Sequence, residues 1–168
     1  MNMGFFSRLF GSEASQPGVE EAVSDVYKVD VTLKANHSVT STKGLQGYQC
    51  QNYFREILQT EFPEYTFKEN VAVQDLVGNV DATFRLYETR PYQAYKAEWG
   101  APYTFVVVRE GKVVAVIMLA EKWKQYNNVK YLISKMYMKK MGVAYIPFYT
   151  ELANDIGYVV SRLRKTLQ

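Results

Sequence analysis

The period with which apolar and polar residues alternate changes several times along this 168-residue chain, and each change marks an expected element. Residues 27–34, YKVDVTLK, alternate with period two, which predicts a half-buried strand at the edge of a sheet. Residues 48–61 repeat apolar side chains at helical spacing and stop before Pro63, so a helix is expected there. Its predicted buried stripe consists of Cys50, Tyr53, Phe54, Ile57 and Leu58.

Further along the chain, residues 65–74 and 80–87 also alternate, and they predict two strands joined by a turn at VGN. Residues 103–109 and 112–120 are almost continuously apolar on either side of a turn, REGK. They predict a hairpin at the centre of a sheet, covered on both faces. The aromatic segment 89–101 has no clear period and is expected to be a loop.

A helix and a short strand are expected after this hairpin. Residues 128–141 predict a helix that ends at Gly142, and residues 143–149, VAYIPFY, predict a strand. Because a helix then connects 112–120 to 143–149, these two strands are expected to be parallel, with Pro147 near a strand end or at a sheet edge. The side chains that the helix is expected to bury are Val129, Leu132, Ile133 and Met136.

The two ends of the chain predict different structures. The closing segment predicts a helix capped by Asn154 or Asp155. Its buried positions are expected to be Ile156, Val159, Leu163 and Leu167. Residues 1–17 predict an amphipathic segment and a linker, followed by a single domain over 18–168. The apolar side of 3–10 could contact a membrane surface, a partner protein or its own domain. The side chains proposed for that contact are Phe5, Phe6, Leu9 and Phe10.

Composition narrows the classes of function. Hydrophobic residues make up 48% of the chain and charged residues 22%, as in a globular domain. One Cys and one His, His37, exclude internal disulfides and make His-based relays and Cys-rich zinc sites improbable. No signal peptide and no apolar run near the length of a membrane span is evident, so a cytoplasmic location is expected. The net charge is only +3, but between residues 122 and 150 there are six Lys and no Asp or Glu.

From Tyr48 onward, the order of helix, strand meander, helix and strand resembles the PD-(D/E)xK restriction-endonuclease-like superfamily. The run KKMGVAYIPFY and the closing TELANDIGYVVSRLRKTL are similar to small bacterial members of that group, and the resemblance covers roughly two thirds of the chain. It implies an α/β fold with a restriction-endonuclease-like core: a helix, an antiparallel strand meander, a helix, a short parallel strand and a C-terminal helix.

The resemblance also implies where catalytic residues would stand. An active member needs an Asp at the start of the first hairpin strand and an acid-x-Lys at the end of the second. Two carboxylates hold magnesium, and the Lys orients the attacking water. Here Pro102 is followed by Tyr103 and Thr104, and Met118 and Ala120 occupy the end of the second strand. The expected function is therefore that of a degenerate, non-catalytic nuclease-like domain with no cofactor.

Two alternatives remain open beside this hypothesis. One is a magnesium-dependent DNA nuclease whose site has migrated to nearby charged residues, which are otherwise ordinary surface charges. The candidates are Glu56, Asp81, Glu121, Lys122 and Lys124. The other alternative is a protein-interaction or membrane-peripheral module that docks through 3–10.

A nuclease-like domain without catalysis could still contact nucleic acid. The lysines expected to meet phosphates are Lys130, Lys135 and Lys139 on the helix 128–141. The aromatic residues expected to stack on bases are Trp123, Tyr126 and Tyr131. A solvated helix flank explains the same pattern.

Overall fold

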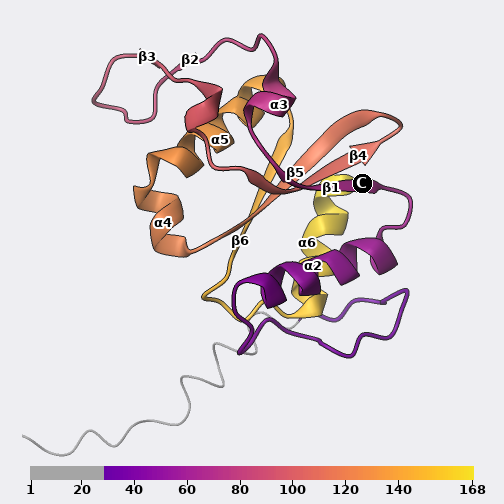
Figure 1. Ribbon diagram of the computed structural model, residues 1–168. Coiled ribbons are helices and arrows are strands. Elements are labelled where there is room, and N and C mark those ends of the chain that lie inside the picture. Colours follow the sequence, from indigo (N-terminus) through magenta and orange to yellow (C-terminus); the bar gives the residue numbers. More distant parts are fainter. Residues whose placement is uncertain (1–28) are drawn as a thin grey trace, which may run out of the picture.

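A four-stranded mixed sheet separates two layers of helices in the computed structural model of this protein, which describes residues 29–168 (Figure 1). The strands are β1 (Thr66–Val71), β4 (Tyr103–Arg109), β5 (Lys112–Ala120) and β6 (Ala144–Tyr149), in the order β1-β4-β5-β6. β1 pairs antiparallel with β4, β4 pairs antiparallel with β5, and β5 pairs parallel with β6. The protein is therefore a mixed α/β structure.

The β4–β5 hairpin lies at the centre of the sheet, as its apolar sequence predicted. Glu110 and Gly111 form the turn with φ of 51° and 75°, the left-handed conformation that tight hairpins require. Phe105 and Ile117 pack on one face of the sheet, while Val106 and Val116 pack on the other. Both faces of the hairpin are covered, which explains why period two is absent from these strands.

The helices α2 (Tyr48–Glu61) and α6 (Ile156–Leu167) cover one face of the sheet. All the side chains predicted to be buried in these two helices are buried, so both predictions are confirmed. The Asp155 side chain accepts a hydrogen bond from the Gly157 N–H at 2.9 Å and caps α6 as predicted. The described residues before α2, 29–47, form what we name the leading segment, and Val29 in it lies against the start of α6. A side chain at Gly157 would stand 2.0 Å from the carbonyl oxygen of Val29, so only glycine fits there.

The opposite face is covered by α5 (Val129–Met141), which begins and ends as predicted. Gly142 ends the helix with φ of 69°. The predicted buried face is partly wrong, because Val129 is exposed and Leu132 and Met136 are only half-buried. The residues that α5 buries are Ile133, Ser134, Tyr137 and Met138.

Polar groups cause this difference in α5. The Ser134 hydroxyl donates to the Ala101 carbonyl at 2.6 Å, and the Tyr137 hydroxyl donates to the Tyr95 carbonyl at 2.6 Å. The Ser134 hydroxyl also lies 3.0 Å from the Lys130 carbonyl of its own helix. The Tyr137 hydroxyl, in contrast, has its acceptor outside α5, which favours this side of the helix facing the protein. Counting apolar residues alone could not place them there.

The predicted hairpin of strands 65–74 and 80–87 is wrong. β1 has β4 as its partner, and the chain then turns into α3 (Gln74–Val77) on the α5 side of the sheet, where Val73 and Val77 are buried. Of the second predicted strand only β2 (Thr83–Phe84) forms, and it pairs with β3 (Gln93–Ala94) in a separate two-stranded ribbon. Alternation could not reveal which strand each one pairs with.

The predicted edge strand over 27–34 is wrong for its described part. Residues 31–34 alternate in burial, and Val31 and Leu33 pack against the core, but no strand pairs with them. Residues 1–28 lie outside the described part of the chain, and with them the amphipathic segment 3–10. None of the helices formed by residues 29–168 is long and apolar enough to cross a membrane.

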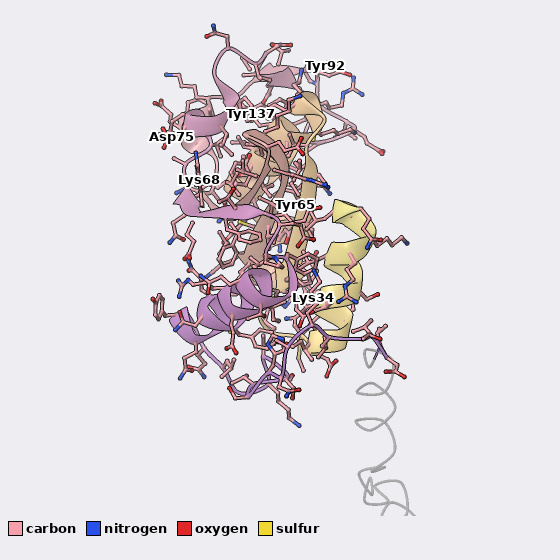
Figure 2. All side chains as sticks on the ribbon, turned by 90° about the vertical axis from the view of Figure 1, so that its right-hand side faces the viewer. Lys34, Tyr65, Lys68, Asp75, Tyr92 and Tyr137 are labelled. Carbon is pink, nitrogen blue, oxygen red and sulfur yellow. The ribbon has the colours of Figure 1, made fainter. Side chains whose placement is uncertain are left out.

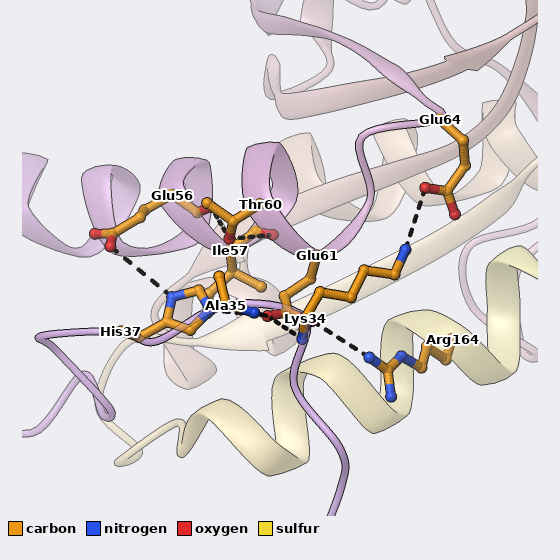
Figure 3. Close-up of polar contacts among 9 residues, drawn as sticks. All are labelled: Lys34, Ala35, His37, Glu56, Ile57, Thr60, Glu61, Glu64 and Arg164. Atoms are coloured by element: carbon orange, nitrogen blue, oxygen red, sulfur yellow. Dashed lines mark hydrogen bonds and ion pairs between the residues drawn. The ribbon is translucent and has the colours of Figure 1, made fainter.

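The leading segment is held instead by the carboxylate of Glu61, the last residue of α2 (Figure 3). This carboxylate accepts hydrogen bonds from the backbone N–H groups of Lys34 at 2.8 Å and Ala35 at 3.1 Å. His37 Nε2 lies 2.9 Å from it, and Arg164 Nη2 of α6 lies at 3.3 Å. One buried carboxylate thus joins the leading segment, α2 and α6.

The Glu61 side chain is fully buried, and this burial alone would raise its pKa. The hydrogen bonds from His37, Lys34 and Ala35 outweigh it, so the pKa of Glu61 lies below its ordinary value of 4.5. The stabilisation is therefore complete above about pH 4.5 and is lost as the pH falls through the lowered pKa.

We predict that Glu61→Gln lowers the free energy of unfolding by about 3 kcal/mol at pH 7, because an amide leaves buried donors unpaired. Urea unfolding followed by circular dichroism measures the loss, which should shrink below pH 4.5. The matched control is Glu64→Gln, which removes a half-exposed ion pair with Lys34 and should cost less than about 1 kcal/mol. Equal losses for the two variants would contradict the role assigned to Glu61.

Candidate functional site

A cavity of about 350 Å³ lies where β5 ends, between the start of α2 and the helices α4 (Lys122–Asn127) and α5. We name it the β5-end cavity. Its polar lining includes Gln51, Asn70, Thr104, Glu121, Lys124 and Tyr131. Thr104 and Ala120 both line it, so the cavity coincides with the place where the family resemblance puts a nuclease site.

The positions that would carry the nuclease signature instead serve the backbone and the core. Thr104 Oγ1 accepts a hydrogen bond from the Leu119 N–H at 3.0 Å, and so links β4 to β5. Tyr103 is fully buried, its hydroxyl donates to the Ser134 carbonyl at 2.8 Å, and burial raises its pKa. Met118 is buried on the α5 side of the sheet. These side chains therefore stabilise the packing of β4, β5 and α5.

One acid and one lysine of the migrated-site hypothesis do meet at the cavity. Glu121 Oε1 lies 2.8 Å from Lys124 Nζ, and this hydrogen bond is the main cause that raises the pKa of Lys124. The Lys122 side chain is exposed, while its backbone N–H donates to a carboxylate oxygen of Glu151 at 2.6 Å. Glu121 is thus already neutralised by a neighbour from its own helix.

The sequence analysis missed Glu151, although the parallel strands held the signal. Ala120 at the end of β5 pairs with Tyr149 at the end of β6. Residues that follow the paired ends of two parallel strands emerge at the same edge of the sheet. Glu121 follows Ala120 directly and Glu151 follows Tyr149 after one residue, so Glu151 can reach the backbone N–H of Lys122.

The other two acids of the hypothesis lie elsewhere. Glu56 is half-exposed, and its carboxylate is 3.9 Å from His37 Nδ1. Asp81 accepts a hydrogen bond from the Thr83 N–H at 2.9 Å and lies 3.2 Å from Lys140 Nζ, and these contacts lower its pKa.

The geometry of α5 separates Asp81 from Glu121. Lys140, the partner of Asp81, is in the last turn of α5, whereas α4 and Glu121 precede its first turn. At about 1.5 Å per residue, those two ends of the helix are about 18 Å apart. The three acids do not converge, and no group of three His, Cys, Asp or Glu side chains in residues 29–168 is placed to hold a metal ion.

The predicted nucleic-acid residues lie on α4 and α5. Lys130, Lys135 and Lys139 are exposed, and the Trp123 side chain is 75% exposed. Lys135 and Lys139 share one outer face, but Lys130 is rotated by about 140° from Lys135 at helical spacing. Tyr131 is half-buried and lines the β5-end cavity, and the Tyr126 side chain lies outside what the structure describes.

A further polar cluster, which the sequence did not predict, borders the cavity on the α2 side. Arg55 forms two hydrogen bonds with the carboxylate of Glu69 on β1, at 2.6 Å and 2.7 Å, and Gln51 donates to the same group at 2.8 Å. The hydrogen bonds from Arg55 are the main cause that lowers the pKa of Glu69. This pairing fixes Gln51, and thus one wall of the β5-end cavity, against the edge strand.

Comparisons of this chain with protein-family models, with curated proteins and with solved structures find no match. The resemblance to the restriction-endonuclease-like superfamily therefore rests on the order of elements and on short runs of sequence.

We predict that Thr104→Val lowers the free energy of unfolding by about 1–2 kcal/mol, because the Leu119 N–H loses its acceptor. Thr104→Ser keeps the hydroxyl and should cost about half as much or less. Thermal and urea unfolding of both variants measure the difference. A valine variant as stable as the serine variant would show that the Thr104 hydroxyl has no structural role.

Proposed function

We propose that this protein has a restriction-endonuclease-like core that binds nucleic acid without hydrolysing it. The sheet order β1-β4-β5-β6, with only the last pair parallel, supports such a core. So do the flanking helices α2 and α6 on one face and the crossover through α5 on the other.

One observation carries the nucleic-acid part of the proposal. Between residues 122 and 150 there are six Lys and no acid. Lys124 pairs with Glu121 and Lys140 with Asp81. The side chains of Lys122, Lys130, Lys135 and Lys139 form no ion pair with any other residue of 29–168. Lysines on a helix without acidic residues, such as Lys130, Lys135 and Lys139 on α5, attract phosphates, and Trp123 offers an exposed ring on the preceding helix α4.

The composition of the β5-end cavity supports binding without cleavage. Magnesium in nucleases is held by carboxylates, and hydrolysis needs a polarised water near them. Among the described residues that line the cavity, Glu121 is the single carboxylate, and Lys124 neutralises it. The other polar groups are amides and hydroxyls, such as Gln51, Asn70 and Thr104, which bind divalent cations weakly without a second acid.

We predict that Lys135→Gln combined with Lys139→Gln weakens binding to a DNA oligonucleotide several-fold at low salt. Fluorescence anisotropy over a salt series should show the slope of log K against log salt concentration become shallower by up to about 2, roughly one for each lost phosphate contact.

The matched control for this variant is Lys43→Gln combined with Lys112→Gln, which removes the same charge from exposed positions outside α4 and α5. An equal loss of affinity in the control would show that net charge, and not the α5 face, determines binding. If the unaltered protein does not bind DNA even at low salt, the proposed function is wrong.

We also predict that the protein leaves DNA intact when incubated with Mg²⁺ or Mn²⁺, because Glu121 is the single carboxylate among the described residues that line the cavity. Gel electrophoresis of a labelled oligonucleotide checks this. Cleavage that needs the metal and disappears in Glu121→Gln would establish the migrated nuclease site instead.

A further inference from the structure

The two-stranded ribbon of β2 and β3 and its connecting loop form a projection, residues 83–94, that we name the β2–β3 finger. Its base is anchored on α5. Phe84 is buried, stacks on Tyr95 at 4.9 Å between ring centroids, and contacts the edge of Tyr137 at 5.5 Å. The Tyr137 hydroxyl donates to the Tyr95 carbonyl at 2.6 Å, and Lys140 pairs with Asp81 just before the ribbon.

The tip of the finger is exposed to solvent, in contrast to its buried base. Residues 87–94 are all exposed, and the side chains of Tyr92 and Tyr87 are 65% and 40% exposed. An arginine stands over each ring: Arg85 lies 5.0 Å from the centroid of Tyr92, and Arg90 lies 5.2 Å from that of Tyr87. Figure 2 shows Tyr92 near the top end of the molecule, with Tyr137 below it and Lys34 in the lower half.

The exposure of Tyr87 and Tyr92 is not explained by the packing of the fold. Burying these rings would stabilise the fold, whereas here each is held outward with a cation against one face. A ring with a guanidinium over one face can stack an unpaired base on its other face, and the guanidinium can also bind the adjoining phosphate. The finger carries two arginines, Arg85 and Arg90, against a single acid, Glu88, so its charge suits a polyanion.

We infer that the β2–β3 finger is a binding element for single-stranded nucleic acid, with Tyr87 and Tyr92 stacking on bases and Arg85 and Arg90 contacting the backbone. Bases stacked inside a duplex cannot reach such a platform, so the finger confers a preference for single strands. The inference rests on the proposed function. It also extends it, because the finger is anchored on the same last two turns of α5 that carry Lys135 and Lys139.

The test compares a fluorescein-labelled single-stranded oligonucleotide with a duplex of the same sequence, using anisotropy with the full chain. In the variant Tyr87→Ala combined with Tyr92→Ala, affinity for the single strand should fall about tenfold or more, while affinity for the duplex changes less than twofold. Lys135→Gln combined with Lys139→Gln should weaken binding to both. The matched control is Tyr48→Ala, which removes a ring that is 67% exposed and lies under Arg55 on α2.

Three outcomes would overturn the inference. If the unaltered protein binds the duplex as tightly as the single strand and the tyrosine variant binds both as before, the finger has no role, although the proposed function stands. If the tyrosine variant and the Tyr48 control lose the same affinity, binding is not specific to the finger. If neither nucleic acid binds at low salt, both the inference and the proposed function fail. Melting temperatures within a few degrees of the unaltered protein show that each variant is folded.

Discussion

The parallel pairing of β5 and β6 is the constraint on which the rest of the structure depends. Because the two strands run in the same direction, the chain must cross back over the whole sheet between Ala120 and Ala144. That crossing is made by α4 and α5, and it covers the second face of the central hairpin. The helix that closes the core is thus the same helix that presents the lysines.

The rotation of α5 determines what this helix can bind. The hydroxyls of Ser134 and Tyr137 donate to the carbonyl groups of Ala101 and Tyr95, and this side of the helix is buried against the protein. Lys135 and Lys139 then face outward. The Tyr137 contact also anchors the β2–β3 finger, so two hydroxyl groups inside the structure position both parts of the proposed binding surface.

The residues at the positions of the nuclease signature contribute to this arrangement. Thr104 and Tyr103 bond to backbone groups of β5 and α5, and Met118 fills the space beneath α5. Residues that secure the crossover thus occupy the positions at which the family resemblance would place catalytic acids.

The sequence predicted those elements whose stability is local or set by period. Helices α2 and α6, the β4–β5 hairpin and Gly142 follow from apolar spacing and capping. The sequence-based predictions failed where a residue or strand distant in the chain determines the local structure. The backbone of Lys34 and Ala35 bonds to the Glu61 carboxylate and not to a neighbouring strand. β1 pairs with β4 and not with β2. Glu151 accepts a hydrogen bond from the Lys122 N–H because β5 and β6 are parallel and end side by side.

The most direct measurement of the central claim is a titration of the ¹⁵N-labelled full chain with a single-stranded oligonucleotide, followed by amide chemical shifts in NMR spectra. The account predicts that the chemical-shift changes concentrate in residues 85–96 and 122–140, on one side of the sheet. The amide chemical shifts of α2 and α6 should not change. Shifts confined to α2 and α6, or none at low salt, would contradict it.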